Sequence, residues 1–151
     1  MSDKHDGFIL QHFLPYRLVN TAERASHALS TLYADKFDMT IHEWRIVATL
    51  GSQKNLTAKV IGQKTQMDKV AVSRAITRLS KKAFVDRQRD PQDGRALKLN
   101  LSKAGQKVYK SLIPAVLAWE QQFTAEFSPE EMELLHMLLS RLQSQLEKLG
   151  Y

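Results

Sequence analysis

The sequence predicts a mainly α-helical protein with one small β-hairpin, organised as a winged helix-turn-helix lobe plus a helical dimerisation lobe. Apolar residues recur at helical spacing over most of the chain, two short helical segments meet at a brief break near residue 67, and a two-residue alternation begins at Leu97. We expect a single domain over residues 1–151. Within it, residues 40–101 form the winged lobe and residues 8–35 and 102–151 supply dimerisation helices.

Composition places the chain among ordinary soluble proteins. Of its 151 residues 43% are apolar, and no apolar run approaches the roughly 18 residues that a membrane span needs. The polar start, Met1–Asp6, lacks the apolar core of a signal peptide. The absence of cysteine excludes disulfides, thiolate metal sites and thiol sensors. We therefore expect a cytoplasmic protein with no membrane partner.

Charge is segregated along the chain. Residues 54–110 hold fifteen Lys/Arg and four Asp/Glu, whereas the rest of the chain holds seven Lys/Arg and twelve Asp/Glu. A basic centre in an acidic frame is typical of a module that binds a polyanion. A solvated lysine-rich surface is the alternative, but it does not explain the segregation.

The first long segment, Phe8 to Tyr33, is predicted as a helix. Its apolar residues step by four and three along one face, and Pro15 marks a point where the helix either begins or kinks. Thr40 and Glu43 then form a capping box that opens a helix to about Leu50, where Gly51 is expected to end it.

A helix-turn-helix pair follows. Thr57 can cap a short helix over residues 58–64, and Asp68 can cap a longer one that reaches Ala83. Two helices so closely joined, with a supporting helix before them, suggest a helix-turn-helix.

A hairpin comes next, with residues 85–89 pairing across a turn-rich link to the alternating residues 97–101. A short strand is expected before it. A hairpin directly after a helix-turn-helix is a wing.

The C-terminal part is predicted as two helices. Ser102 caps the first, which reaches about Phe127 and contains the helix-kinking Pro114, and Ser128 opens the last with a second capping box. The last helix carries a stripe of apolar residues at heptad-like spacing: Met132, Leu135, Leu139, Leu142, Leu146 and Leu149. Such a stripe favours a homodimer interface, although packing within the same chain remains open.

The helix from Asp68 to Ala83 is the predicted recognition helix for double-stranded DNA. Val72, Ile76, Leu79 and Ala83 are expected to face inward. Arg74 is the expected base contact, because a guanidinium can bond guanine O6 and N7 together. Ser73 and Thr77 are short enough for base or phosphate contacts, and Lys69, Arg78, Lys81 and Lys82 are expected on phosphates. The full predicted DNA-binding set is Lys69, Val70, Ser73, Arg74, Thr77, Arg78, Lys81, Arg87, Arg89, Asp93 and Arg95.

The predicted wing tip carries Asp93 and Arg95. An arginine on a slim hairpin can enter the minor groove, with Asp93 orienting it, and its loss should then cost at least roughly 1 kcal/mol of binding. The alternative is that Asp-Gly-Arg is only a favourable turn. Arg87 and Arg89 would flank the DNA backbone.

Several of these segments resemble the MarR-type (multiple antibiotic resistance regulator) winged-helix family. The resemblance is carried by residues 70–74, 78–85, 90–95 and 99–105, and the order of helices matches over essentially the whole chain. It implies a homodimeric repressor that binds a palindromic operator and is released by a small, often phenolic or aromatic, acid. By position, Arg74 and Arg95 match the family's major-groove and minor-groove arginines. Ala83 departs from the glycine usual there, so the helix end is expected to differ.

An effector site is expected at the first helix and at the helix that Thr40 caps. Its candidate residues are Phe13, Tyr16, Arg17, Asn20, His42, Trp44 and Arg45, since rings can stack on an aromatic acid and an arginine can pair with its carboxylate. Equally, the aromatic residues belong to the core and the arginines pair with acids of the dimer. The histidines lack metal-site spacing and no catalytic motif occurs, so we expect no cofactor, no metal and no enzymatic activity. A winged-helix protein that binds nucleic acid with little sequence preference is the alternative function, and an interaction module that has lost DNA binding is a third.

Overall fold

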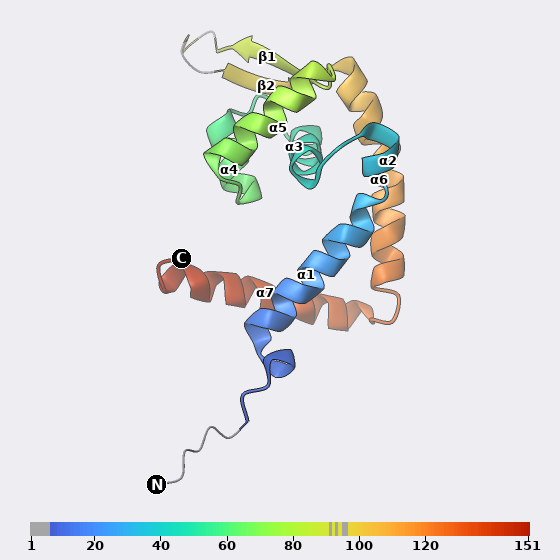
Figure 1. The fold of residues 1–151 in the computed structure, drawn as a ribbon, viewed down its shortest axis with the longest axis vertical. Helices are drawn as coiled ribbons and strands as arrows, with labels where there is room; N and C mark the ends of the chain where they lie inside the picture. Colours follow the sequence, from blue (N-terminus) through green and yellow to red (C-terminus); the bar gives the residue numbers. More distant parts are fainter. Residues whose placement is uncertain (1–6, 91, 93, 95–96) are drawn as a thin grey trace. The chain divides into compact units, whose positions relative to one another are not determined.

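A computed structural model of the chain describes residues 7–90, 92, 94 and 97–151, and it confirms the predicted fold class. The chain is mostly helical with one two-stranded antiparallel hairpin (Figure 1). Its elements are a 3-10 turn Leu10–His12, α1 Leu14–Ser30, α2 Ala34–Phe37, α3 Ile41–Ser52, α4 Ala58–Thr65, α5 Lys69–Lys81, β1 Val85–Arg89, β2 Leu97–Leu101, α6 Lys103–Phe123 and α7 Pro129–Lys148.

The chain divides into two compact units, Met1–Val116 and Leu117–Tyr151, with the division inside α6. In the first unit, α3 packs against both α4 and α5, and the hairpin packs on α5. Its core draws on every one of these elements and on the first half of α6: Tyr33, Met39, Trp44, Ile46, Val47, Leu50, Ile61, Met67, Val72, Ala75, Ile76, Leu79, Val85, Leu99, Leu101, Val108 and Leu112. No helix among the described residues combines the length and apolar character that a membrane crossing requires.

All five predicted helix caps are present. At the start of α6, the Ser102 hydroxyl accepts from the Gly105 N–H at 3.0 Å. Thr40 and Ser128 each form a complete capping box, in which the hydroxyl accepts from the N3 backbone N–H and the N3 glutamate accepts from the cap's own N–H. The Thr57 hydroxyl accepts from a backbone N–H of α4 at 3.3 Å, and an Asp68 carboxylate oxygen accepts from a backbone N–H of α5 at 2.8 Å. Each helix therefore begins where a local side chain satisfies one of its free amides.

The N-terminal helix is shorter than predicted. It begins at Leu14, after the separate 3-10 turn, and ends at Ser30, so residues 8–33 are not one helix. Pro15 sits in the first turn, where its missing N–H leaves no hydrogen bond unmade. Of the two roles predicted for Pro15, the structure shows a helix start and not a kink.

Gly51 does not end its helix, because α3 continues to Ser52. A Cβ on Gly51 would lie 2.3 Å from Cε2 of Tyr109. The glycine is needed because the ring of a residue on α6 lies against the α3 backbone.

The end of α5 also differs from expectation. Ala83 adopts the left-handed conformation, with φ +57°, although it is not glycine. The Ala83 N–H donates to the Ser80 carbonyl at 3.0 Å, and the next N–H donates to the Leu79 carbonyl at 2.9 Å. These are the two hydrogen bonds of a Schellman motif, so the helix ends in the glycine-type geometry despite the Cβ. The inward position predicted for Ala83 is wrong, because this residue is exposed. Ala75, which was not predicted to face inward, is buried.

The hairpin has the predicted strands, with Val85 opposite Leu101 and Arg89 opposite Leu97. Leu99 and Leu101 are buried, whereas Leu97 remains exposed at the start of β2. Leu56 exchanges backbone hydrogen bonds with Leu99 at 3.3 and 2.8 Å, so a single β-bridge stands where a short strand was expected before the wing. The hairpin is thus joined to the segment between α3 and α4.

The second unit contains the end of α6 and all of α7. α6 ends at Phe123, earlier than predicted, and contains Pro114. The leucine stripe of α7 is exposed from Leu135 to Leu149, and no residue of α7 is buried.

Candidate nucleic-acid interface

The two faces of α5 differ sharply in chemistry. Val72, Ala75, Ile76 and Leu79 are buried in the lobe. Seven residues predicted to point outward are exposed: Lys69, Val70, Ser73, Arg74, Thr77, Arg78 and Lys81. The outward face therefore carries four cations, two hydroxyls and one apolar side chain.

Local geometry sets where α5 begins. α4 ends at Thr65, and the left-handed backbone of its C-cap Gln66 (φ +53°) turns the chain so that Asp68 can cap α5 two residues later. The hydrogen bond from the Ala71 N–H is the main reason that the pKa of the Asp68 carboxyl lies below its usual value. Desolvation acts in the opposite direction. The Val70 N–H and the electrostatic effects of His42 and Arg74 lower this pKa further. The first turn of α5 therefore presents a carboxylate that is ionised at neutral pH.

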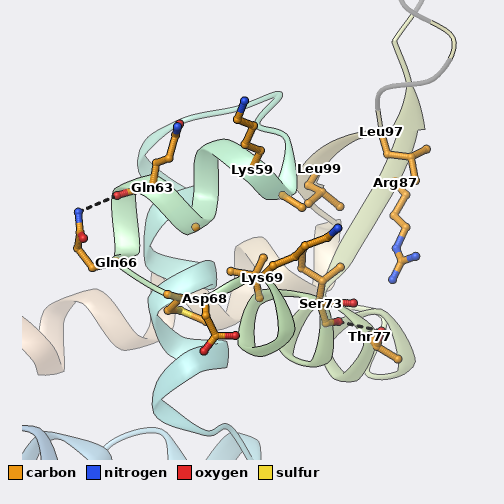
Figure 2. A pocket seen from close by; sticks show the side chains of 15 residues that line it. Lys59, Gln63, Gln66, Asp68, Lys69, Ser73, Thr77, Arg87, Leu97 and Leu99 are labelled. Carbon is orange, nitrogen blue, oxygen red and sulfur yellow. Dashed lines mark hydrogen bonds between the residues drawn. The ribbon is translucent and has the colours of Figure 1, made fainter. Parts of the chain in front are cut away.

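A groove of about 920 Å³ lies between α4, α5 and the hairpin (Figure 2). Its floor is apolar and includes Val72, Ile76 and Leu99. Polar side chains surround it from all three elements. Those at α4 are Lys59, Gln63 and the C-cap Gln66; those at α5 are the N-cap Asp68, Lys69, Ser73 and Thr77; β1 contributes Arg87. The groove thus lies between the outward face of α5 and the wing, where Arg87 of β1 lines it.

Val70 lies at the start of the outward face and is 58% exposed. Among the described residues of the winged lobe, it and Leu97 are the large apolar side chains that remain exposed. An exposed methyl-bearing side chain on a base-facing helix end can contact the thymine methyl group.

The wing contributes two of its predicted residues. Arg87 and Arg89 are exposed on β1, and Arg87 lines the groove. Lys98 on β2 forms an ion pair with Asp90 at 3.2 Å. Asp93 and Arg95 lie outside the described residues, so their minor-groove role stays a prediction.

Lys82, predicted as an outward phosphate partner, does not join this face. Its ammonium donates to Oε1 of Glu43 at 2.9 Å and to the carbonyl of Asp38, and it lies 3.4 Å from Oδ2 of Asp38. Arg78 Nε lies 3.4 Å from Oε2 of the same glutamate. The sequence showed Glu43 only as half of a capping box, because its partners on α5 are distant in sequence.

Glu43 itself has no exposed surface. Burial would raise the pKa of its carboxyl, but hydrogen bonds from the Thr40 N–H, from Lys82 and from the Thr40 hydroxyl outweigh it and hold this pKa below its ordinary value. A charged carboxylate is therefore enclosed between α3 and the end of α5.

A second cavity, of about 560 Å³, lies between α1, α3 and the segment that joins them. Of the predicted effector residues, Arg45 lines it. Trp44 is buried and stacks on Tyr33, with ring centroids 5.7 Å apart, so it is a core residue. His42 is exposed and acts electrostatically on Asp68 at the start of α5.

The remaining predicted effector residues lie away from this cavity's lining. Phe13, Tyr16 and Arg17 are exposed at the start of α1, and the Asn20 amide donates to the Tyr16 hydroxyl at 3.4 Å. The sequence argument did not find Tyr33, which lines the cavity. Its hydroxyl is buried without a hydrogen-bond partner; burial raises the pKa of this phenol, and the charge of Arg45 partly offsets the rise.

The described residues contain no cluster of three or more potential metal ligands. Two helices at a tight turn, backed by α3 and followed by a hairpin with a basic strand, define the winged helix-turn-helix class.

Comparison with known proteins shows which regulators the chain is similar to. Residues 37–96, which cover most of this lobe, match the model of the MarR family. A MarR/EmrR family transcriptional regulator from Acinetobacter sp. ADP1 has a TM-score of 0.86 and 26% identity, over 93% of this chain and 99% of its own. The winged lobe therefore matches the MarR family, and the chain has the fold of a MarR-family regulator.

Two further relatives agree with this. An uncharacterised HTH-type transcriptional regulator of Bacillus cereus is 24% identical over 124 residues, which is 82% of either chain. MepR of S. aureus, in a structure with DNA, has the same fold with a TM-score of 0.81 and 21% identity, over 88% of this chain and 98% of its own. The family and its relatives are transcriptional regulators and not enzymes.

Proposed function

We propose that this protein is a transcriptional repressor that binds a palindromic DNA operator as a homodimer and is released by a small aromatic or phenolic acid. One observation carries the DNA-binding part: the outward face of α5 gathers Lys69, Arg74, Arg78 and Lys81 beside a groove whose other wall bears Arg87. A cationic helix face of this kind fits the major groove, and the wing then reaches the flanking backbone.

The side chains of this face take different roles. Arg74 is the base-reading residue, with Val70 as an apolar contact and Ser73 and Thr77 as short polar ones. Lys69 and Lys81 bind phosphates, which sets affinity and salt dependence but not sequence. Arg95 inserts into the minor groove, oriented by Asp93, and Arg87 and Arg89 contact the backbone beside it.

A homodimer is supported by apolar surface that each unit leaves exposed. In the first unit Phe8, Phe13, Leu14 and Leu18 are exposed, and in the second the leucine stripe of α7 is exposed throughout. Burying such a stripe against a second copy removes apolar area from water. Two-fold symmetry of the protein then requires a palindromic operator with half-sites about one helical turn apart.

The effector is assigned to the cavity between α1 and α3. Arg45 offers a cation for a carboxylate, and the unpaired hydroxyl of Tyr33 offers a buried hydrogen-bond donor. A volume of about 560 Å³ suits a small aromatic acid. Repression follows if the operator overlaps a promoter and the acid binds preferentially to a form with lower DNA affinity.

Fluorescence anisotropy tests the proposal. The purified protein is first used to select duplexes from a random pool, and its affinity for the recovered duplex is compared with that for a scrambled duplex across a salt series. We expect a specificity ratio of at least about 10³ and a steep salt dependence. Salicylate, benzoate and protocatechuate should weaken binding to the selected duplex in the wild type but not in Arg45→Ala.

The alternative function, binding with little sequence preference, predicts equal affinity for both duplexes. Under that alternative, Arg74→Ala would weaken binding to both by the same factor. Under the proposed function, it reduces the ratio between them.

A further inference from the structure

The contact between Glu43 and the end of α5 joins segments that are far apart in sequence. Glu43 is the N3 residue of α3, Lys82 is the C-cap of α5, and Arg78 lies one helical turn before Lys82. The carboxylate receives the Lys82 ammonium on Oε1, and the Thr40 N–H and Arg78 Nε on Oε2. Both oxygens are thus paired, and the two cations come from the DNA-facing helix.

Because Glu43 is completely buried, its carboxylate requires its charged partners to stay at fixed positions. A carboxylate with 0% exposure loses its hydration and is tolerated only where its partners stay in place. Removing a partner from such a pair is costly, so Glu43 holds the end of α5 at one position on α3. Asp38, by contrast, meets the same Lys82 with a side chain that is 87% exposed, and such surface pairs contribute little.

The geometry of α5 carries this effect to the base-reading residue. Arg74 and Arg78 are four residues apart and lie on the same helix face, one turn above the other. A contact that fixes Arg78 and Lys82 against α3 therefore fixes the rotation of α5 about its axis, and with it the direction in which Arg74 projects. The same contact keeps Lys82, whose side chain is 19% exposed, away from any phosphate.

We propose that Glu43 is a positioning residue for DNA recognition: it sets the orientation of α5 and withholds Lys82 from non-specific phosphate contact. This inference rests on the proposed DNA-binding function. It goes beyond that function by assigning sequence discrimination in part to a buried residue that touches no DNA.

Glu43→Gln tests the proposal, because the amide oxygen can still accept from the Thr40 N–H while the negative charge is lost. The selected and scrambled duplexes are titrated with wild type and variant across a salt series. We expect the specificity ratio to fall at least tenfold. We also expect the slope of log affinity against log salt to steepen by about 0.9, because the freed Lys82 can then reach a phosphate. Binding to the scrambled duplex should tighten.

Two further variants separate positioning from simple folding. Asp38→Asn removes the exposed partner of Lys82 and should leave both the ratio and the slope unchanged. Lys82→Met should lower the ratio without steepening the slope, and it provides the test even if Glu43→Gln does not fold. Thermal denaturation and circular dichroism establish that each variant is folded before it is titrated.

Each result has a defined meaning. A Glu43→Gln protein that binds both duplexes more weakly by the same factor, with an unchanged slope, shows a purely structural glutamate and overturns the proposal. An unchanged ratio in both Glu43→Gln and Lys82→Met also overturns it. If the wild type itself does not distinguish the duplexes, the proposed function fails, and the slopes still decide whether Glu43 withholds Lys82.

Discussion

The left-handed backbone at Ala83 predicts that replacing this residue with glycine increases the stability of the protein. With φ at +57°, its Cβ crowds the following carbonyl, which costs an L-residue roughly 1–2 kcal/mol. Ala83→Gly removes this strain, while the added freedom of glycine in the unfolded chain costs about 0.4–1 kcal/mol. The net expectation is a variant more stable by roughly 0.5–1 kcal/mol.

Urea and thermal denaturation measure this change. For a chain of this length, 1 kcal/mol corresponds to about 2–4 °C, so Tm should rise by roughly 1–4 °C. DNA affinity should not change, because Ala83 lies beyond the last turn of α5 and its carbonyl, which accepts from the Ser102 hydroxyl at 2.6 Å, is retained.

Ala118→Gly is the matched control, since Ala118 is exposed inside α6. There the same substitution should destabilise the protein by about 0.8–1 kcal/mol. If Ala83→Gly lowered Tm as well, backbone strain at Ala83 would be refuted as a component of stability.

Three other substitutions test the remaining structural arguments. Arg74→Ala should lower the ratio of the affinity for the selected duplex to that for the scrambled duplex. Lys81→Ala should weaken binding to the two duplexes by the same factor and reduce the salt slope by about 0.9. The same pattern for the two variants in anisotropy titrations would contradict these roles. Gly105→Ala places a Cβ 2.0 Å from a backbone carbonyl oxygen and should cost roughly 1–3 kcal/mol in urea denaturation, while Gly94→Ala, with nothing within 4 Å, should not. The pKa of Glu43 lies below its ordinary value of 4.5 in the folded protein, so its stabilisation is complete above that pH and is lost as pH falls through the folded-state value. The free energy of unfolding should therefore decrease less between about pH 6 and about pH 4 in Glu43→Gln than in the wild type. An equal decrease in the two proteins would show that this carboxyl does not contribute to acid unfolding.

Local features of the fold could be predicted because their physical causes lie within a few residues. Thr40, Asp68 and Ser128 cap helices through N–H groups three residues ahead, so the sequence alone locates these helix starts. The two periodicities, near 3.6 for helices and 2 for the wing strand, distinguish α5 from β2 for the same reason.

The features that sequence reasoning missed depend on partners distant in the chain. Gly51 looked like a helix end because Tyr109, 58 residues later, is not part of its local pattern. Lys82 looked like a phosphate contact because its partner Glu43 is 39 residues away. The outward surface of α5 follows from periodicity, whereas the contact of Lys82 with Glu43 follows only from tertiary packing.

If the proposed homodimer forms through the exposed leucine face of α7, the stability of the protein depends on its concentration. A chain whose fold is completed by a second copy unfolds and dissociates in one reaction, so mass action adds about 1.4 kcal/mol to its stability for each tenfold rise in concentration. Titrations at nanomolar protein then sample a less stable and partly dissociated species than calorimetry does at higher concentration. A loss of apparent DNA affinity on dilution would report the surface of α7 and not the contacts of α5.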